Sequence, residues 1–90
     1  MERRIKRKAG DIMQQISLCE LKHGQRATVT AVNVRGNLRR RLQDIGLVPG
    51  ASVECINSGL FGDPVAYLIR GAVIALRKED SSAVSVLPIQ

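Results

Sequence analysis

The chain has 90 residues and a formal net charge of +6, so we expect one small domain with a thin hydrophobic core. Phe61 and Tyr67 are its two aromatic residues, too few for a surface that stacks single-stranded nucleic acid. Cys19, Cys55 and His23 are widely spaced, and they predict no metal site. We expect both cysteines to be buried as small hydrophobic residues and His23 to be an exposed turn residue.

The first 16 residues are expected to form a basic, flexible tail. Arg3, Arg4, Lys6, Arg7 and Lys8 lie within the first ten residues, and without those ten, nine basic residues face seven acidic ones. The tail has two interpretations, a solvated extension or a contact with an anionic membrane surface. The remaining charge is too balanced to predict DNA binding.

The start of the chain lacks the apolar segment of a signal peptide. No apolar run in the sequence is long enough to span a bilayer. We therefore expect a cytoplasmic protein with reduced thiols, either free or peripheral at the inner membrane.

The folded domain is expected to cover residues 17–90. Ser17 and Glu20 have the spacing of a capping box. The following stretch, 25–34, alternates between apolar and polar residues, which predicts a half-buried strand.

The segment from Asn37 to Gly50 reads NLRRRLQDIGLVPG. Asn37 as N-cap and Gly46 just past the end predict a helix over residues 38–45. Leu38, Leu42 and Ile45 then share one buried stripe, because they lie within about 60° of each other on the helix.

The three arginines of this helix cannot share one face. Arg41 flanks the apolar stripe, where its stem can lie on apolar neighbours, while Arg39 and Arg40 point outward. Arg39 and Arg40 lie in the first turn, where positive charge opposes the helix dipole. They are either solvated charge or part of a functional surface.

The second half of the chain reads as short strands joined by turns. Pro49 and Gly50 predict a type II turn. Further turn positions are Gly46, Gly62, Asp63, Pro64 and Gly71. The expected strands cover 52–57, 65–71, 73–76 and 83–87, with a helical turn at 77–82. About five strands and one short helix predict an all-β fold, a small closed barrel.

The chain resembles the FeoA domain family over about residues 17–87. The resemblance rests on Leu18, Leu21 and Gly24, on RRLQDIGLVPG at 40–50, GDP at 62–64, RG at 70–71, ALRKED at 75–80, and Val86. It implies an SH3-like barrel that works with FeoB, a membrane ferrous-iron transporter with a cytoplasmic G domain. Ser81 departs from the family, which favours alanine at that position.

The resemblance implies a non-enzymatic accessory protein of ferrous iron uptake that binds the cytoplasmic part of FeoB. The expected contact residues are Arg39 and Arg40, with Leu60 and Phe61, which either plug the barrel or touch the partner. No phosphate-binding loop, metalloprotease motif or nucleophile–base signature is present. No resident cofactor is expected, and transient binding of iron stays open.

Two alternatives belong to another class of function. One is a regulatory module related to the SH3-like C-terminal domain of DtxR-type metal-dependent repressors. The other is a basic nucleic-acid-binding module, in which the tail and the helix arginines contact phosphate, although the charge distribution disfavours it.

Overall fold

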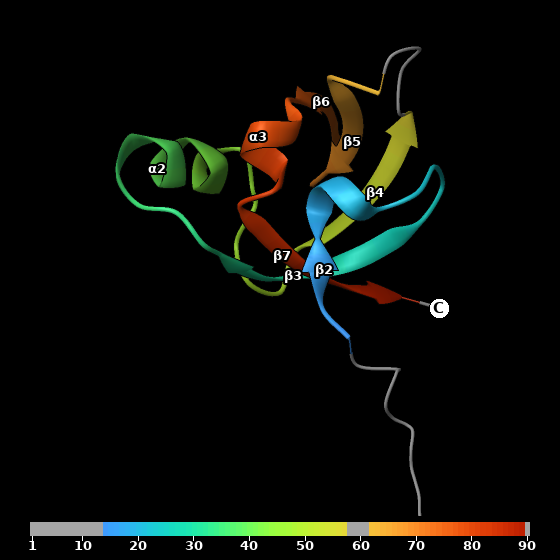
Figure 1. The fold of residues 1–90 in the computed structure, drawn as a ribbon, viewed down its shortest axis with the longest axis horizontal. Helices are drawn as coiled ribbons and strands as arrows, with labels where there is room; N and C mark the ends of the chain where they lie inside the picture. The colour runs from blue at the N-terminus through green and yellow to red at the C-terminus, as the bar shows by residue number, and fades with distance from the viewer. Residues whose placement is uncertain (1–13, 58–61, 90) are drawn as a thin grey trace, which may run out of the picture.

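The computed structural model describes residues 14–57 and 62–89. These residues form short strands and helices, shown in Figure 1. In chain order they are β2 (Ile16–Ser17), the 3-10 helix η2 (Leu18–Glu20), β3 (Arg26–Val32), α2 (Gly36–Asp44), β4 (Ser52–Asn57), β5 (Val65–Ile69), β6 (Ala72–Leu76), α3 (Lys78–Ser81) and β7 (Val84–Ile89).

The strands form one antiparallel sheet in the order β2-β7-β3-β4-β5-β6. The expected all-β class is confirmed. Within the described residues the sheet has six strands rather than about five, because Ile16 and Ser17 pair with Val86 and Ser85. This short strand was not expected, since two residues carry no periodic pattern.

Two irregularities bend the sheet. The pairing of β3 with β7 shifts between Val29 and Ala31, and the pairing of β4 with β5 shifts between Cys55 and Asn57. Such shifts bend a strand and increase its twist. They let the sheet curl around one core while α2 stands to one side of it (Figure 1).

The core is built from the inward residues of the strands. Ala27 and Val29 of β3 are buried, as their alternation predicts. Leu42 of α2 is 1% exposed, and Leu38 and Ile45 pack partly buried against the same core, so the expected apolar stripe of the helix is confirmed. The other fully buried side chains include Leu18, Leu47, Val53, Cys55, Tyr67, Ile69, Val84 and Val86.

Tyr67 lies fully buried in this core. Its hydroxyl donates a hydrogen bond to the Leu18 carbonyl oxygen at 3.3 Å, which ties η2 to the barrel. Burial raises the pKa of Tyr67 to about 12, although the neighbouring Ser81 side chain lowers it in part. The phenol is therefore neutral in the folded protein at ordinary pH.

The start of α2 differs from the expectation. The helix begins at Gly36, and Arg35 is the N-cap residue, with no side-chain hydrogen bond. The expectation that Asn37 caps the helix was wrong, because Gly36 adopts a φ of +74° and turns the chain into the helix earlier. The capping box of Ser17 and Glu20 is present as expected, with the Ser17 N–H donating to Glu20 Oε2 at 2.9 Å.

The end of α2 is confirmed at Gly46. Its N–H donates to the Gln43 carbonyl, and the Leu47 N–H donates to the Leu42 carbonyl, the two bonds of a Schellman motif. Gly46 has a φ of +108°. A Cβ atom here would also clash with the Arg70 stem, lying 2.9 Å from its Cγ, so Gly46 is required for conformation and for space.

The turn at Pro49 and Gly50 is also confirmed. Gly50 has a φ of +94°, and the Ala51 N–H donates to the Val48 carbonyl at 3.0 Å. These features match a type II turn with Pro49 and Gly50 at its centre.

We expect Gly50→Val to lower the free energy of unfolding by about 1–3 kcal/mol. A Cβ at Gly50 meets no atom within 4 Å, so the cost is backbone strain rather than a clash. Urea denaturation measures it. Gly50→Asn is the control, since asparagine tolerates positive φ better, and its loss should be smaller. Equal losses for both variants would contradict the turn assignment.

The raised pKa of Tyr67 makes stability depend on pH. The pKa of Tyr67 in the folded state lies above the ordinary value of about 10. The buried neutral phenol therefore makes its full contribution to stability below about pH 10, and this contribution declines as the pH rises to 12. Between pH 8 and 11, unfolding free energy should fall by about 1.4 kcal/mol more in the parent than in Tyr67→Phe. Identical dependence of the unfolding free energy on pH in the parent and in Tyr67→Phe, measured by urea denaturation, would refute the raised pKa of the buried phenol.

Candidate partner-binding surface

The exposed side of α2 carries the arginines that the sequence singled out. Figure 1 shows the helix projecting to one side of the sheet, joined to it by the segments after β3 and before β4. Arg39, Arg40 and Arg41 are all exposed. Their surroundings differ, and the differences decide which of them can meet a partner.

Arg39 is exposed, but its guanidinium folds back onto the main chain. Its Nη1 atom donates to the carbonyl oxygens of Val32 at 3.1 Å and Val34 at 3.4 Å. These carbonyls lie at and just beyond the end of β3. Arg39 therefore holds α2 to the sheet, and the expectation of a side chain that only points outward was wrong.

Arg41 links the two helices. Its Nη2 atom lies 3.3 Å from Asp80 Oδ2 on α3, with the side chains 67% and 21% exposed. A pair this exposed contributes less than about 1 kcal/mol. We expected the stem of Arg41 to lie along the apolar stripe, but its side chain extends to Asp80 instead. The spacing of residues in the sequence could not reveal this contact.

Arg40 keeps its charge free within the described residues. It is exposed, and neither a hydrogen bond nor an ion pair joins it to another described residue, Asp44 included. It is the fifth of the nine residues of α2, so it lies beyond the first turn of the helix. The helix dipole acts mainly within the first and last turns, so the expectation that Arg40 opposes it was wrong, because α2 begins two residues earlier than expected.

The expected turn residues lie where the chain changes direction. Gly46, Gly50, Gly62 and Gly71 all have positive φ. Asp63 has a further contact, because its Oδ1 atom accepts a hydrogen bond from the Lys78 N–H at 2.9 Å. That N–H belongs to the first turn of α3, whose N-cap residue Arg77 makes no side-chain bond. Pro64 follows Asp63 and leads into β5.

The sequence did not predict the role of Arg70. Arg70 and Gly71 join β5 to β6 with φ values of +51° and +85°, the signs of a type I′ turn. A positive φ is unfavourable for arginine. The Arg70 side chain extends beside Gly46 at the end of α2, and this contact between distant segments has no sequence signal.

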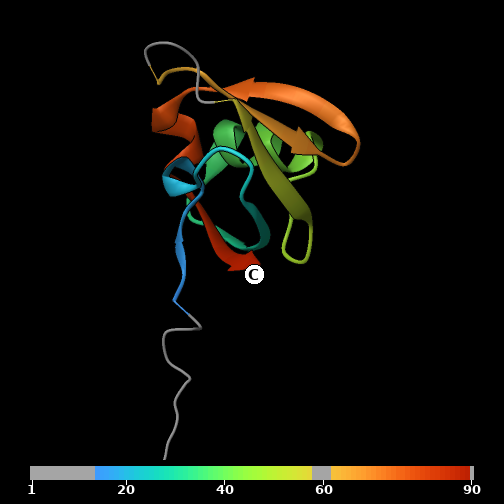
Figure 2. The ribbon, with the colours of Figure 1, turned by 90° about the vertical axis from the view of Figure 1, so that its right-hand side faces the viewer.

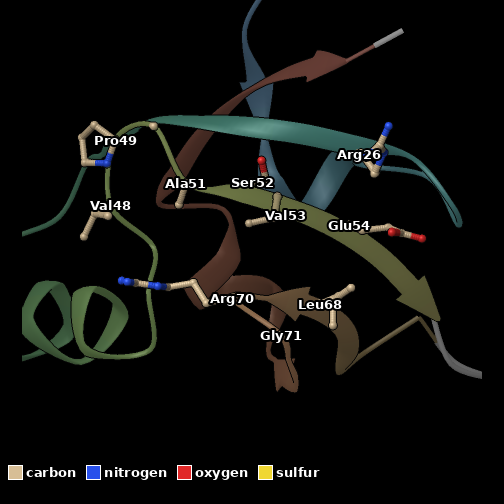
Figure 3. Close-up of a pocket in the computed structure, with 11 residues that line it drawn as sticks. Arg26, Val48, Pro49, Ala51, Ser52, Val53, Glu54, Leu68, Arg70 and Gly71 are labelled. Carbon is tan, nitrogen blue, oxygen red and sulfur yellow. The ribbon is translucent and has the colours of Figure 1, made fainter.

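Arg70 also borders a surface cavity of about 600 Å³. Figure 3 shows Arg70 extending toward Val48, while Arg26 and Glu54 lie at the other end. The remaining lining residues are Pro49, Gly50, Ala51, Ser52, Val53, Leu68 and Gly71. Its wall is mostly apolar with three charged side chains, and the sequence did not predict it.

The residues that could bind a metal do not converge. Within residues 14–57 and 62–89, no three histidine, cysteine or acidic side chains form a group that could hold a metal ion. His23 is exposed, as expected of a turn residue. Cys55 is buried, and burial raises the pKa of its thiol. Cys19 is only half-buried, so the expectation of a fully buried thiol was wrong there.

Some expected functional residues lie outside the described residues. They are Leu60 and Phe61 and the basic residues of the tail, Arg3, Arg4, Lys6, Arg7 and Lys8. In the described parts of the chain, no helix is long and apolar enough to cross a membrane.

Solved structures define the class of this fold. The FeoA protein of Chlorobium tepidum is 35% identical with a TM-score of 0.77, over 83% of this chain and 71% of that one. The FeoA protein of Stenotrophomonas maltophilia, solved with zinc, is 29% identical with a TM-score of 0.70, over 79% and 88%. It is described as a prokaryotic SH3 domain protein. The chain is therefore an SH3-like domain, as the sequence predicted.

The chain belongs to the FeoA domain family. The family model matches residues 16–88. A curated relative, an Fe(2+) transport protein A/Fe(2+) transporter FeoB fusion protein of Porphyromonas gingivalis, is 33% identical over 69 residues. The match covers 77% of this chain and 8% of that protein.

A manganese-dependent transcriptional repressor shares the architecture. Its TM-score is 0.76 at 17% identity, over 86% of this chain and 43% of the repressor. At this identity the likeness concerns the fold alone, and a shared fold does not imply a shared function. The regulatory alternative therefore gains no functional support from it.

Proposed function

We propose that this protein is a non-enzymatic accessory of bacterial ferrous iron uptake that binds the cytoplasmic part of a FeoB-type transporter. One observation carries the proposal: in P. gingivalis a region 33% identical to this chain belongs to a single FeoA–FeoB fusion protein. Covalent linkage gives two domains a high effective concentration. Two separate chains that work together lack this covalent linkage, so they need a binding surface instead.

A second relative supports the same function. The S. maltophilia protein is described as a candidate activating factor for bacterial ferrous iron transport. An activating factor needs contact with the transporter rather than chemistry of its own. The proposed site of action is therefore the cytoplasmic face of the membrane.

The zinc complex of that relative bears on metal binding. It supports transient binding of a transition metal ion, such as iron, as part of the proposed function. In this chain, the described residues offer no cluster of three ligand side chains. The proposal therefore gives the metal no resident role.

We assign the contact to the exposed side of α2, with Arg40 at its centre. Arg39 and Arg41 are engaged within the domain by their bonds to Val32, Val34 and Asp80. Arg40 is exposed, and neither a hydrogen bond nor an ion pair joins it to another described residue, so no contact within the described part of the domain accounts for its charge. An acidic surface on the partner would compensate its charge. Leu60 and Phe61 lie outside the described residues, and they stay in the proposal as candidate apolar contacts with the partner.

We expect Arg40→Glu to weaken binding to the FeoB cytoplasmic region by more than about tenfold, or roughly 1.4 kcal/mol. The fold should persist, because Arg40 makes no described bond, although the new glutamate lies four residues from Asp44 and repels it by a few tenths of a kcal/mol, roughly. Isothermal titration measures binding, and urea denaturation measures stability.

Lys22→Glu is the matched control, because Lys22 is exposed and belongs to the segment between η2 and β3, which lies on the opposite side of the view from α2 in Figure 1. It should leave the affinity unchanged. Parent affinity in Arg40→Glu would move the interface away from α2. A parent protein that fails to bind the transporter region would instead overturn the proposed function. Arg39→Glu is unsuitable, because it also removes two main-chain hydrogen bonds.

A further inference from the structure

The outer edge of β6 is a second surface, away from α2. β6 is the last strand of the sheet and pairs only with β5 among the described strands. Figure 2 shows the β5–β6 hairpin with β6 outermost. No main-chain hydrogen bond joins this edge to another described segment. Toward the described part of the chain, the edge therefore presents main-chain groups without a partner.

The register identifies these groups. Ile69 and Ala72 close the two-residue turn, and in such a hairpin the closing pair is hydrogen-bonded. Hydrogen-bonded pairs alternate with non-bonded pairs along an antiparallel ladder. Ala72, Ile74 and Leu76 therefore face β5, while the N–H and C=O groups of Val73 and Ala75 point away from the sheet.

The composition of β6 is unusual for a free edge. Its sequence is AVIAL, with no charge and no proline. Val73 is 64% exposed, and Ala72 and Ala75 are exposed as well. Edges usually carry charged residues, proline or bulges that prevent pairing with another chain. This strand has none of these protections, so it is suited to accept an additional strand.

Basic residues flank the apolar strand at both ends. Arg70 precedes it and Arg77 follows it, both exposed, with Lys78 next. Symmetric antiparallel pairing of two copies would place Val73 opposite Ala75 of the second copy, and Arg70 opposite Lys78 of the second copy. Like charges placed opposite each other destabilise such a pair. In this register the charges disfavour a second copy, and the exposed Arg77 favours a segment with an acidic end.

We propose that β6 is a docking strand, which adds to the sheet an extended segment of another protein with apolar residues at its centre and an acidic residue at the end that lies beside Arg77. Main-chain hydrogen bonds to Val73 and Ala75 provide the attachment. Arg77 selects the charge of the segment, because the Arg70 side chain extends toward Gly46 and Val48 instead. The proposal does not depend on the assignment of α2 to FeoB, because the two surfaces use different residues.

The test uses a capped peptide of alternating valine and threonine with two aspartates at each end. It is titrated into the full-length, isotopically labelled protein and followed by NMR. The amide protons of Val73 and Ala75 should move downfield and gain protection from hydrogen exchange. The same peptide with lysines in place of the aspartates should bind about tenfold more weakly, or worse.

Two protein variants separate the parts of the proposal. Ala75→Pro removes one outward N–H without removing a bond to β5, and should weaken binding by about tenfold. Arg77→Glu tests the charge, with Lys22→Glu as its matched control, and it keeps the test decisive if Ala75→Pro does not fold. Only Arg77→Glu of these two charge variants should weaken binding.

Several results would overturn the proposal. They are no binding of the aspartate peptide at millimolar concentration, shifts that cluster at residues 48–53 rather than on β6, or equal binding of the lysine peptide. Shifts of the β6 amides on dilution of the protein alone would show self-pairing, and would overturn the choice of partner.

Discussion

The burial of Tyr67 is the constraint on which the rest of the structure depends. Its ring is fully enclosed, and its strand, β5, pairs with β4 on one side and β6 on the other. Its hydroxyl needs a partner, because an unpaired buried hydroxyl costs about 1–3 kcal/mol. The Leu18 carbonyl provides that partner, so one side chain joins η2 to the sheet. Ser81 of α3, a buried polar residue in the described part, stands near the same phenol and donates to the Lys78 carbonyl.

Because the core is filled by packed side chains, the surfaces that can bind a partner lie on the outside of the domain. The two outer surfaces differ in character. On α2, two of three neighbouring arginines hold the helix to β3 and α3, which leaves Arg40 available to a partner. On β6 the main chain itself is available, between two basic residues. Asp63 connects the family motifs GDP and ALRKED in space, because it binds the first turn of α3. These motifs are therefore explained by packing rather than by partner contact.

Local signals in the sequence predicted most of the fold. Apolar–polar alternation identified β3, the dipeptide Pro49-Gly50 identified the turn before β4, and Gly46 identified the end of α2. Each of these signals depends on residues that lie close together in the chain. Contacts between distant segments could not be predicted. Arg39 bonds carbonyls beyond its own helix, and Arg70 adopts a left-handed conformation beside Gly46. The prediction that Asn37 caps α2 was wrong, because Gly36 with its positive φ starts the helix one residue before it. The residue types at the candidate site were thus predictable, whereas the availability of each arginine was not.

The central claim is that this FeoA domain meets a FeoB-type transporter through the exposed side of α2. The most direct measurement is an NMR titration of the labelled full-length protein with the cytoplasmic region of the transporter, read at every assigned amide. The account predicts shifts and broadening centred on Arg40 and its neighbours in α2, with smaller effects on the end of β3 that Arg39 contacts. Saturation binding with the α2 amides unchanged would contradict it.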